Sequence, residues 1–135
     1  MSLETLLQTM REQDIDNSEV AVSLDEFFEG NEDPGSIGSN LGDDQPPIKE
    51  FYRVLKEVAA RPDVLDVTVR VIGMDDGQWP YTDTVYIVSS RAREEVVQWV
   101  AALLPTEVHE GWLYGRPQAA PDPQAPYSAY SVWWD

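Results

Sequence analysis

The hydrophobic pattern changes from a helical to a strand period at Arg61-Pro62, and this change restricts the fold more than any other feature. Before it, an apolar helical face follows Pro46-Pro47, which suit the first turn of a helix because proline has no N–H. After it, residues 64–74 alternate apolar with polar side chains, as in a half-buried strand. The apolar positions are Ile48, Phe51, Tyr52, Leu55, Val58 and Ala59 in the helix, and Leu65, Val67, Val69 and Val71 in the strand. The sequence therefore predicts a helix that packs on a strand.

Further elements are expected on both sides of this pair. Residues 2–12 have helical spacing of leucines, and residues 19–24 alternate like a short strand. Ser23 and Glu26 match a capping box, so a helical turn over residues 24–29, closed by Gly30, is the alternative there. Residues 81–89 are expected to form an antiparallel hairpin with residues 64–74 across a turn at 74–78. A second main helix is expected at 91–104 with Ser90 as its N-cap, and strands at 106–114 and 127–134.

These elements predict an α+β fold in one domain of 135 residues: an antiparallel sheet with two main helices packed on one face, plus a short N-terminal helix. Within residues 1–135 we distinguish an N-terminal helix and turn at 1–18, a glycine-rich acidic loop at 32–45, and a proline-rich connector at 116–126. A loop as long as 32–45 is more often functional or disordered than incidental. The chain has no run of about 20 apolar residues and no signal-like N-terminus, so we expect no membrane partner and a cytoplasmic location.

The charge is strongly acidic and unevenly distributed. The chain has 25 acidic and nine basic residues, a net charge of −16, and residues 1–50 contain 13 of the acidic residues but two basic ones. Such a field repels nucleic acid and anionic lipid and attracts a basic partner. The alternative interpretation is that the acidity only keeps the protein in solution.

The usual catalytic motifs are absent from the sequence. The chain has no cysteine and a single histidine, His109, and no G-x-S-x-G elbow or phosphate-binding loop. Leu113 stands where a second zinc-binding histidine would complete a motif that starts with His109-Glu110. The oxygen-rich segment 29–35 lacks the ligand spacing of an EF-hand. We therefore assign no catalytic residue, no metal ligand and no cofactor.

Aromatic and acidic side chains provide the candidate binding residues. Tryptophan and tyrosine dominate the energetics of protein interfaces, whereas carboxylates accelerate association with a basic surface. Adjacent Trp133 and Trp134 must point to opposite faces of a regular strand, so one of them should enter the core. The predicted partner-binding residues are Asp25, Glu26, Glu29, Glu32, Asp33, Trp79, Tyr81 and Trp112.

The leading hypothesis is a small acidic protein-binding domain without enzymatic activity, such as an inhibitor, immunity protein or adaptor for a basic partner. In size, charge and lack of cysteine the chain is similar to toxin-immunity proteins, although it shares no motif with them. The enzyme alternative is a metal-dependent hydrolase that uses clustered carboxylates. A third alternative is a DNA mimic, in which carboxylates imitate the phosphates of DNA.

Overall fold

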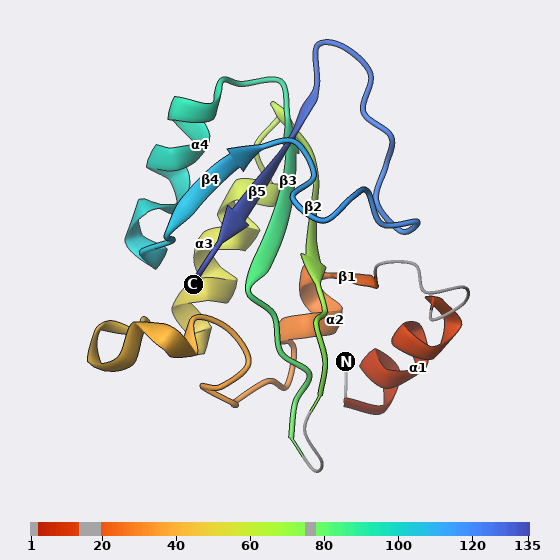
Figure 1. Cartoon of the computed structure of the whole chain (residues 1–135), viewed down its shortest axis with the longest axis vertical. Coiled ribbons are helices and arrows are strands. Elements are labelled where there is room, and N and C mark those ends of the chain that lie inside the picture. Colours follow the sequence, from red (N-terminus) through yellow and green to blue (C-terminus); the bar gives the residue numbers. More distant parts are fainter. Residues whose placement is uncertain (1–2, 14–19, 75–77) are drawn as a thin grey trace.

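The fold is built on a five-stranded sheet in which all neighbouring strands are antiparallel (Figure 1). The computed structural model describes residues 3–13, 20–74 and 78–135. The strand order is β1-β2-β3-β5-β4. The strands are β1 (Ala21–Ser23), β2 (Val64–Arg70), β3 (Thr84–Ser89), β4 (Glu107–Glu110) and β5 (Ser128–Trp133). The helices are α1 (Leu3–Gln13), α2 (Leu24–Phe28), α3 (Ile48–Ala59) and α4 (Arg93–Val100), with 3-10 turns η1 (Ser39–Asp44) and η2 (Ala101–Leu103). The predicted α+β class and antiparallel sheet are confirmed.

One face of the sheet carries a row of valines that crosses all five strands. Val22 pairs with Val69, Val69 with Val85, Val85 with Val132, and Val132 with Val108. Directly paired residues of antiparallel strands point to the same face, so these five side chains form one apolar stripe. All five are buried in the main hydrophobic core.

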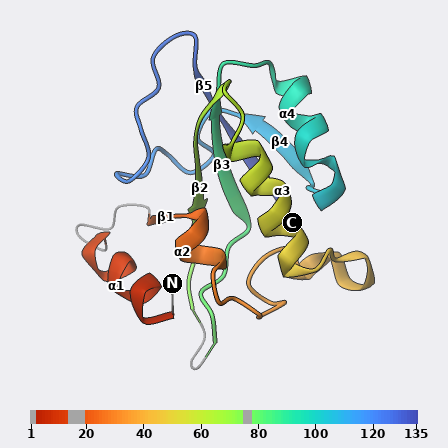
Figure 2. The same cartoon turned by 180° about the vertical axis from the view of Figure 1, so that it is seen from behind.

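The helices cover this valine face. The α3 residues Phe51, Leu55 and Val58, and the α4 residues Val96 and Val100, belong to the same core as the valine row. Figure 2 shows α3 lying across the sheet with α4 beside it. The helical spacing of α3 thus places its predicted apolar face against the strands. Within the described ranges, no helix has both the length and the apolar character needed to span a bilayer.

The other face of the sheet is covered by residues 111–127, here called the connector, which pass in front of the strands in Figure 1. Tyr86 and Ser131 lie on this face and are fully buried. The Trp112 ring packs edge-on against Tyr86, with 5.0 Å between ring centroids. The Ser131 hydroxyl donates to the Gly111 carbonyl at 2.7 Å and accepts from the Leu113 N–H at 3.0 Å. The proline-rich stretch 116–126 is therefore part of a cover over the sheet.

The strand and the capped helical turn that were alternatives near Ser23 both form. Ser23 ends β1, and its hydroxyl accepts from the Glu26 N–H at 3.1 Å, while the Glu26 carboxylate accepts from the Ser23 N–H at 3.1 Å. This capping box starts α2 immediately after the strand. Gly30, with φ of 82°, follows the end of α2, in the left-handed conformation that glycine adopts without strain.

The predicted loop at 32–45 is held against the core. Ile37 is buried and forms a parallel bridge with Thr82, whose N–H donates to the Ser36 carbonyl at 2.8 Å. Gly38 has φ of 68°, and a Cβ there would lie 2.7 Å from the Phe51 ring. This glycine therefore permits both the turn and its close approach to α3.

Three details of the predicted elements are wrong. Leu65 is 51% exposed, because the β2–β3 register shifts between Val64 and Asp66 and removes it from the apolar row. Ser90 is not the N-cap of α4: the N-cap is Ala92, two residues later, whose N–H donates to the Glu95 carboxylate at 3.3 Å. Leu104, the last residue of the helix expected at 91–104, lies outside α4: it follows η2 with φ of 57° and is 45% exposed.

Several predicted elements are longer than the observed ones. The strand expected at 64–74 ends at Arg70, and the strand expected at 81–89 begins at Thr84. The strand expected at 106–114 is reduced to β4, because the connector leaves the sheet after Glu110. The turn predicted after α1, over residues 14–18, and residues 75–77 of the predicted hairpin turn lie outside the described residues.

The two adjacent tryptophans have opposite environments, as the sequence predicts. Trp134 is 2% exposed, its indole N–H donates to the Leu103 carbonyl at 2.8 Å, and its ring contacts Phe51. Trp133 is half-buried and lies on the other face of the sheet, in register with Thr84. Trp134 therefore joins β5, η2 and α3 in one packed unit.

Replacing Trp134 by alanine should lower the free energy of unfolding by about 3–5 kcal/mol, because it removes a buried ring and leaves the Leu103 carbonyl unpaired. Trp133→Ala deletes the same atoms from a half-buried site and should cost clearly less. Urea denaturation of both variants measures the difference. Equal losses would show that Trp134 does not hold the core in the way described.

Candidate partner-binding surface

The predicted acidic residues of α2 have defined contacts within the fold. Glu26 completes the capping box and also accepts a hydrogen bond from the Thr9 hydroxyl, which joins α1 to α2. Asp25 accepts from the Tyr52 hydroxyl at 2.5 Å and from the Lys56 ammonium at 3.0 Å. Glu26 therefore connects α2 to α1, and Asp25 connects α2 to α3.

The contacts of Asp25 lower the pKa of its carboxyl. The hydrogen bond from Tyr52 is the largest cause, followed by that from Lys56, since both favour the charged form. The Asp25 side chain is still 46% exposed, so one side of the carboxylate faces solvent. Asp25 thus combines a structural contact with a charge that a partner can reach.

The acidic residues that follow along the chain differ in exposure. Glu29 is half-buried at the end of α2, and Glu32 is exposed. Asp33 accepts from the Gly35 N–H at 2.8 Å and from the Trp79 N–H at 3.3 Å, so its carboxylate shapes the loop. Among the predicted acidic residues, Glu32 is the most open to a partner.

The three predicted aromatic residues are not one cluster. Trp79 lies beside α2, where its indole N–H donates to the Phe27 carbonyl at 2.8 Å, and it therefore joins Asp33 and the α2 acids. Tyr81 packs against Gly73, where an added Cβ would lie 2.9 Å from the tyrosine hydroxyl. Trp112 lies apart from these contacts, on the connector against Tyr86.

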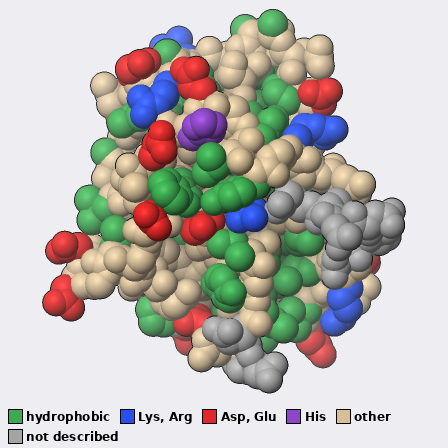
Figure 3. Space-filling model, in the orientation of Figure 1, with side chains coloured by type: hydrophobic (Ala, Val, Ile, Leu, Met, Phe, Trp, Pro, Cys, Tyr) green, Lys and Arg blue, Asp and Glu red, His purple; other side chains and the backbone are tan. Residues whose placement is uncertain are grey.

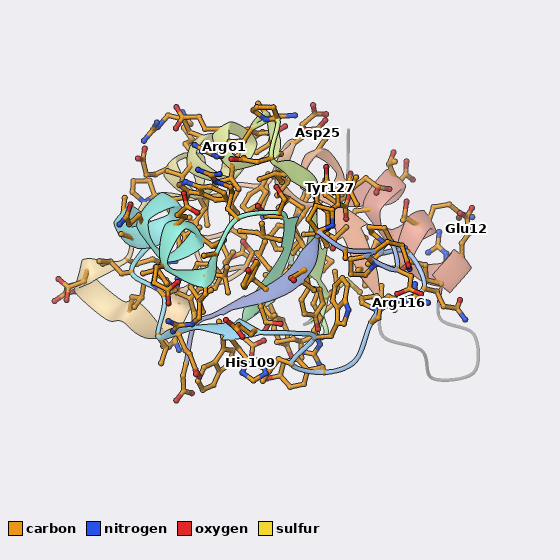
Figure 4. The ribbon with its side chains drawn as sticks, turned by 90° about the horizontal axis from the view of Figure 1, so that it is seen from above. Glu12, Asp25, Arg61, His109, Arg116 and Tyr127 are labelled. Carbon is orange, nitrogen blue, oxygen red and sulfur yellow. The ribbon has the colours of Figure 1, made fainter. Side chains whose placement is uncertain are left out.

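Trp112 also lines a hollow of about 480 Å³ where the connector leaves β4 and returns to β5. Glu110, Tyr127 and Tyr130 line the same hollow, which the sequence interpretation did not assign as a site. Burial raises the pKa of Tyr130, and the nearby Glu110 carboxylate adds to this effect. Figure 4 labels Tyr127, one of these lining residues.

A second hollow, here called the α1 groove, lies between α1 and the chain that continues from β2. It has a volume of about 350 Å³ and a mainly apolar lining. Ile72 and Met74 are 41% and 45% exposed, and are two of the most exposed large apolar side chains in the described structure. The lining residues are Leu7, Met10, Arg11, Val20, Val71, Ile72, Gly73 and Met74. The sequence did not predict this groove, although the apolar spacing of α1, which includes Leu7 and Met10, was a signal for an apolar surface.

Most of the described basic side chains are engaged within the chain. Lys56 pairs with Asp25, Arg61 with Asp63 at 3.1 Å, and Arg91 with both Asp63 and Glu95. Arg53 pairs with Glu50 and Glu57, and Arg70 lies 3.6 Å from Asp83. The Arg61 and Arg70 guanidinium groups also stack on the rings of Trp99 and Tyr114, at 4.0 and 3.7 Å from the centroids. The charge presented to solvent is consequently dominated by carboxylates.

The acidic excess is concentrated at one end of the sheet. The elements of the first 50 residues include α1, α2 and η1, which lie across the lower half of Figure 1, with α1 on the right, α2 in the middle and η1 on the left. We call these three elements the acid-rich end. Exposed carboxylates there include Glu4, Glu12, Glu32, Asp43 and Asp44. In the described ranges, no group of three or more histidine, aspartate or glutamate side chains is placed to hold a metal ion.

Asp66 lies on the face of the sheet that the connector covers, and one of its carboxylate oxygens has no hydrogen-bond partner among the described residues. In the part of the chain that the structure describes, its Oδ2 and the Thr68 Oγ1 are buried and have no hydrogen-bond partner. Burial raises the pKa of Asp66, because the charged carboxylate loses its hydration. When the pKa of a group is higher in the folded than in the unfolded protein, the group stabilises the fold at pH values below its unfolded-state pKa. This stabilisation is lost as the pH rises through the folded-state pKa.

Asp66→Asn should therefore raise the free energy of unfolding at pH 7, where the native protein must bury an ionised carboxylate. At about pH 3, below the usual aspartate pKa, the two proteins should be nearly equal. Asp63→Asn is the matched control and should lower stability at pH 7, since Asp63 pairs with Arg61 and Arg91. Urea denaturation at both pH values makes the comparison, and a loss of stability in Asp66→Asn at pH 7 would contradict this account.

Comparison with known proteins gives a family for the chain. Residues 1–132 match the family described as "Uncharacterized protein YfbO family". The "Uncharacterized protein YfbO" of Escherichia coli (strain K12) is 30% identical over 115 residues, which cover 84% of this chain and 81% of that protein. No solved structure matches the chain.

Proposed function

The chain belongs to the YfbO family, and we propose that it is a protein-binding domain for a basic partner. An inhibitor or immunity-type role is the specific form of this proposal. The partner meets the acid-rich end, where the predicted residues Asp25, Glu26, Glu29, Glu32, Asp33 and Trp79 lie. Tyr81 and Trp112 are the other proposed aromatic contacts.

The observation that carries this proposal is the internal pairing of the basic side chains. The net charge is −16, and five of the nine basic residues are already paired with carboxylates of the same chain. The remaining carboxylates, many of them exposed, have few cations to offset them. Asp and Glu side chains are accordingly spread over the face shown in Figure 3.

Such a surface acts first on the rate of encounter. A field of one sign orients an oppositely charged protein during diffusion and increases the association rate, and salt screens this effect over about 10 Å at 0.1 M. Exposed charge pairs contribute little to the affinity of the final complex. Lasting contact therefore requires apolar burial, and the α1 groove beside the acid-rich end offers an apolar surface for it.

Capture of partners from a lysate of the source cell should depend strongly on salt. We expect the bound protein to be recovered at about 50 mM NaCl and to be largely lost at about 500 mM. The variant Glu32→Gln/Asp43→Asn/Asp44→Asn should bind less at low salt, because it removes three exposed charges from the acid-rich end. The variant Glu57→Gln/Glu94→Gln/Glu107→Gln removes equal charge from exposed sites elsewhere and should bind better than the first. Recovery of the same amount of partner at both salt concentrations, or no binding at either, would contradict the proposal.

The enzyme alternative, a metal-dependent hydrolase with clustered carboxylates, has no supporting contact among the described residues. A native-state metal site would raise the melting temperature when the metal is added. We expect Ca²⁺, Mg²⁺ and Mn²⁺ at about 1 mM to leave the melting temperature unchanged. A rise with one of these ions that is absent with the others would favour the hydrolase instead.

A further inference from the structure

The α1 groove exposes apolar surface beside one helix of the acid-rich end. Ile72 and Met74 form one wall beyond the end of β2, and Leu7 and Met10 of α1 form the other. Exposed apolar side chains that converge on one hollow are typical of contact surfaces, whereas singly scattered ones are ordinary. The groove is therefore a candidate contact surface, and its surroundings restrict what fits.

The charge of the chain selects among possible occupants. A second copy would bring another net charge of −16 to the same place, and nucleic acid or anionic lipid would be repelled in the same way. Glu4 and Glu12 are exposed on α1, and Figure 4 shows Glu12 at the outer side of this helix. Arg11, the basic lining residue, is held by the side chain of Gln8 at 2.9 Å. The net charge of the whole chain, rather than the lining of the groove, therefore favours a cationic occupant.

The form of the groove favours an amphipathic segment. The lining of the groove is mainly apolar, and α1, which forms one of its walls, carries the exposed carboxylates of Glu4 and Glu12. An occupant therefore needs an apolar stripe with lysine or arginine on its flanks. A helix with apolar residues at positions i, i+3 or i+4, and i+7 has this arrangement. Met10 and Met74 both line the groove, and the flexible methionine side chain adapts to different apolar partners.

We propose that the α1 groove binds the apolar face of a basic amphipathic helix of the partner. This inference rests on the proposed function, since it takes the partner to be basic, and adds the place and the form of the contact. Apolar side chains of the helix enter between α1 and the extension of β2. Its basic residues lie over the carboxylates of the acid-rich end.

A synthetic peptide of about 14 residues tests this without the natural partner. The probe has leucine at i, i+3, i+4 and i+7 positions and lysine elsewhere, and the control peptide has glutamate in place of lysine. The protein is labelled with ¹³C at its methionine methyl groups, which are assigned by Met10→Leu and Met74→Leu. We expect the lysine peptide to shift the Met10 and Met74 signals in a saturable way, and the glutamate peptide to shift neither.

Ile72→Asp should weaken binding of the lysine peptide about tenfold or more, because it places a charge on an apolar wall of the groove. Leu65→Asp is the matched control: Leu65 is also an exposed apolar residue, 51% exposed, but it lies outside the groove. It should change the affinity less than about twofold. Met74→Gln provides a second groove variant at an exposed position, with an effect in the same direction as that of Ile72→Asp. Equal effects of Ile72→Asp and Leu65→Asp, or no shift of either methionine, would overturn the inference.

The two proposals fail in different ways. Suppose that the partner captured from lysate loses binding with the Glu32, Asp43 and Asp44 variant but not with Ile72→Asp. The basic-partner proposal then stands and the groove inference is wrong. Loss of binding with both variants, together with retention in Leu65→Asp, supports both proposals.

Discussion

The sheet is buried on both faces, and the rest of the structure depends on this constraint. On one face the valine row from Val22 to Val108 crosses every strand and packs against α3 and α4. Burial of such side chains contributes about 25 cal/mol per Å² of apolar area, which makes this contact the main source of stability. The helices, the loop at 32–45 and Trp134 are all placed by their contact with this core.

The second face is covered in a different way. The connector covers a partly polar surface that includes Thr68, Tyr86 and Ser131. Ser131 is satisfied by the connector backbone, whereas Thr68 Oγ1 and Asp66 Oδ2 find no partner in the described part of the chain. Unpaired buried polar groups cost free energy, so this face is the less stable cover of the two.

The distribution of charge follows from the same arrangement. Once the core is formed, the helices and turns that surround it bring most arginines next to a carboxylate or an aromatic ring. Arg61, for example, contacts both Asp63 and Trp99. The acidic residues outnumber the available cations, so the excess remains on the surface, and the part nearest the α1 groove adjoins exposed apolar side chains. The excess of carboxylates supports the basic-partner proposal, and the mainly apolar groove beside α1 supports the further inference.

Patterns that depend on near neighbours were predictable. The capping box of Ser23 and Glu26 joins residues three positions apart, the apolar face of α3 repeats every three or four residues, and β2 and β3 are consecutive strands of one hairpin. The candidate binding residues were harder to predict than the helices and strands, because the sequence does not show which group a given carboxylate contacts. Asp33 was predicted to meet a partner, yet it binds the backbone of Trp79, 46 positions away. Leu65 fits an alternating pattern perfectly well, and only the shifted register exposes it.

The amino-acid order thus sets the class of fold, the positions of the main helices and strands, and the acidic character of the surface, since these follow from local spacing and composition. The folded chain decides which residues form a surface. Leu7 and Ile72 share a groove although 65 positions separate them, and Trp112 covers Tyr86 because the connector returns over the sheet. Such contacts depend on how strands pair across long stretches of chain, and no short segment carries that information.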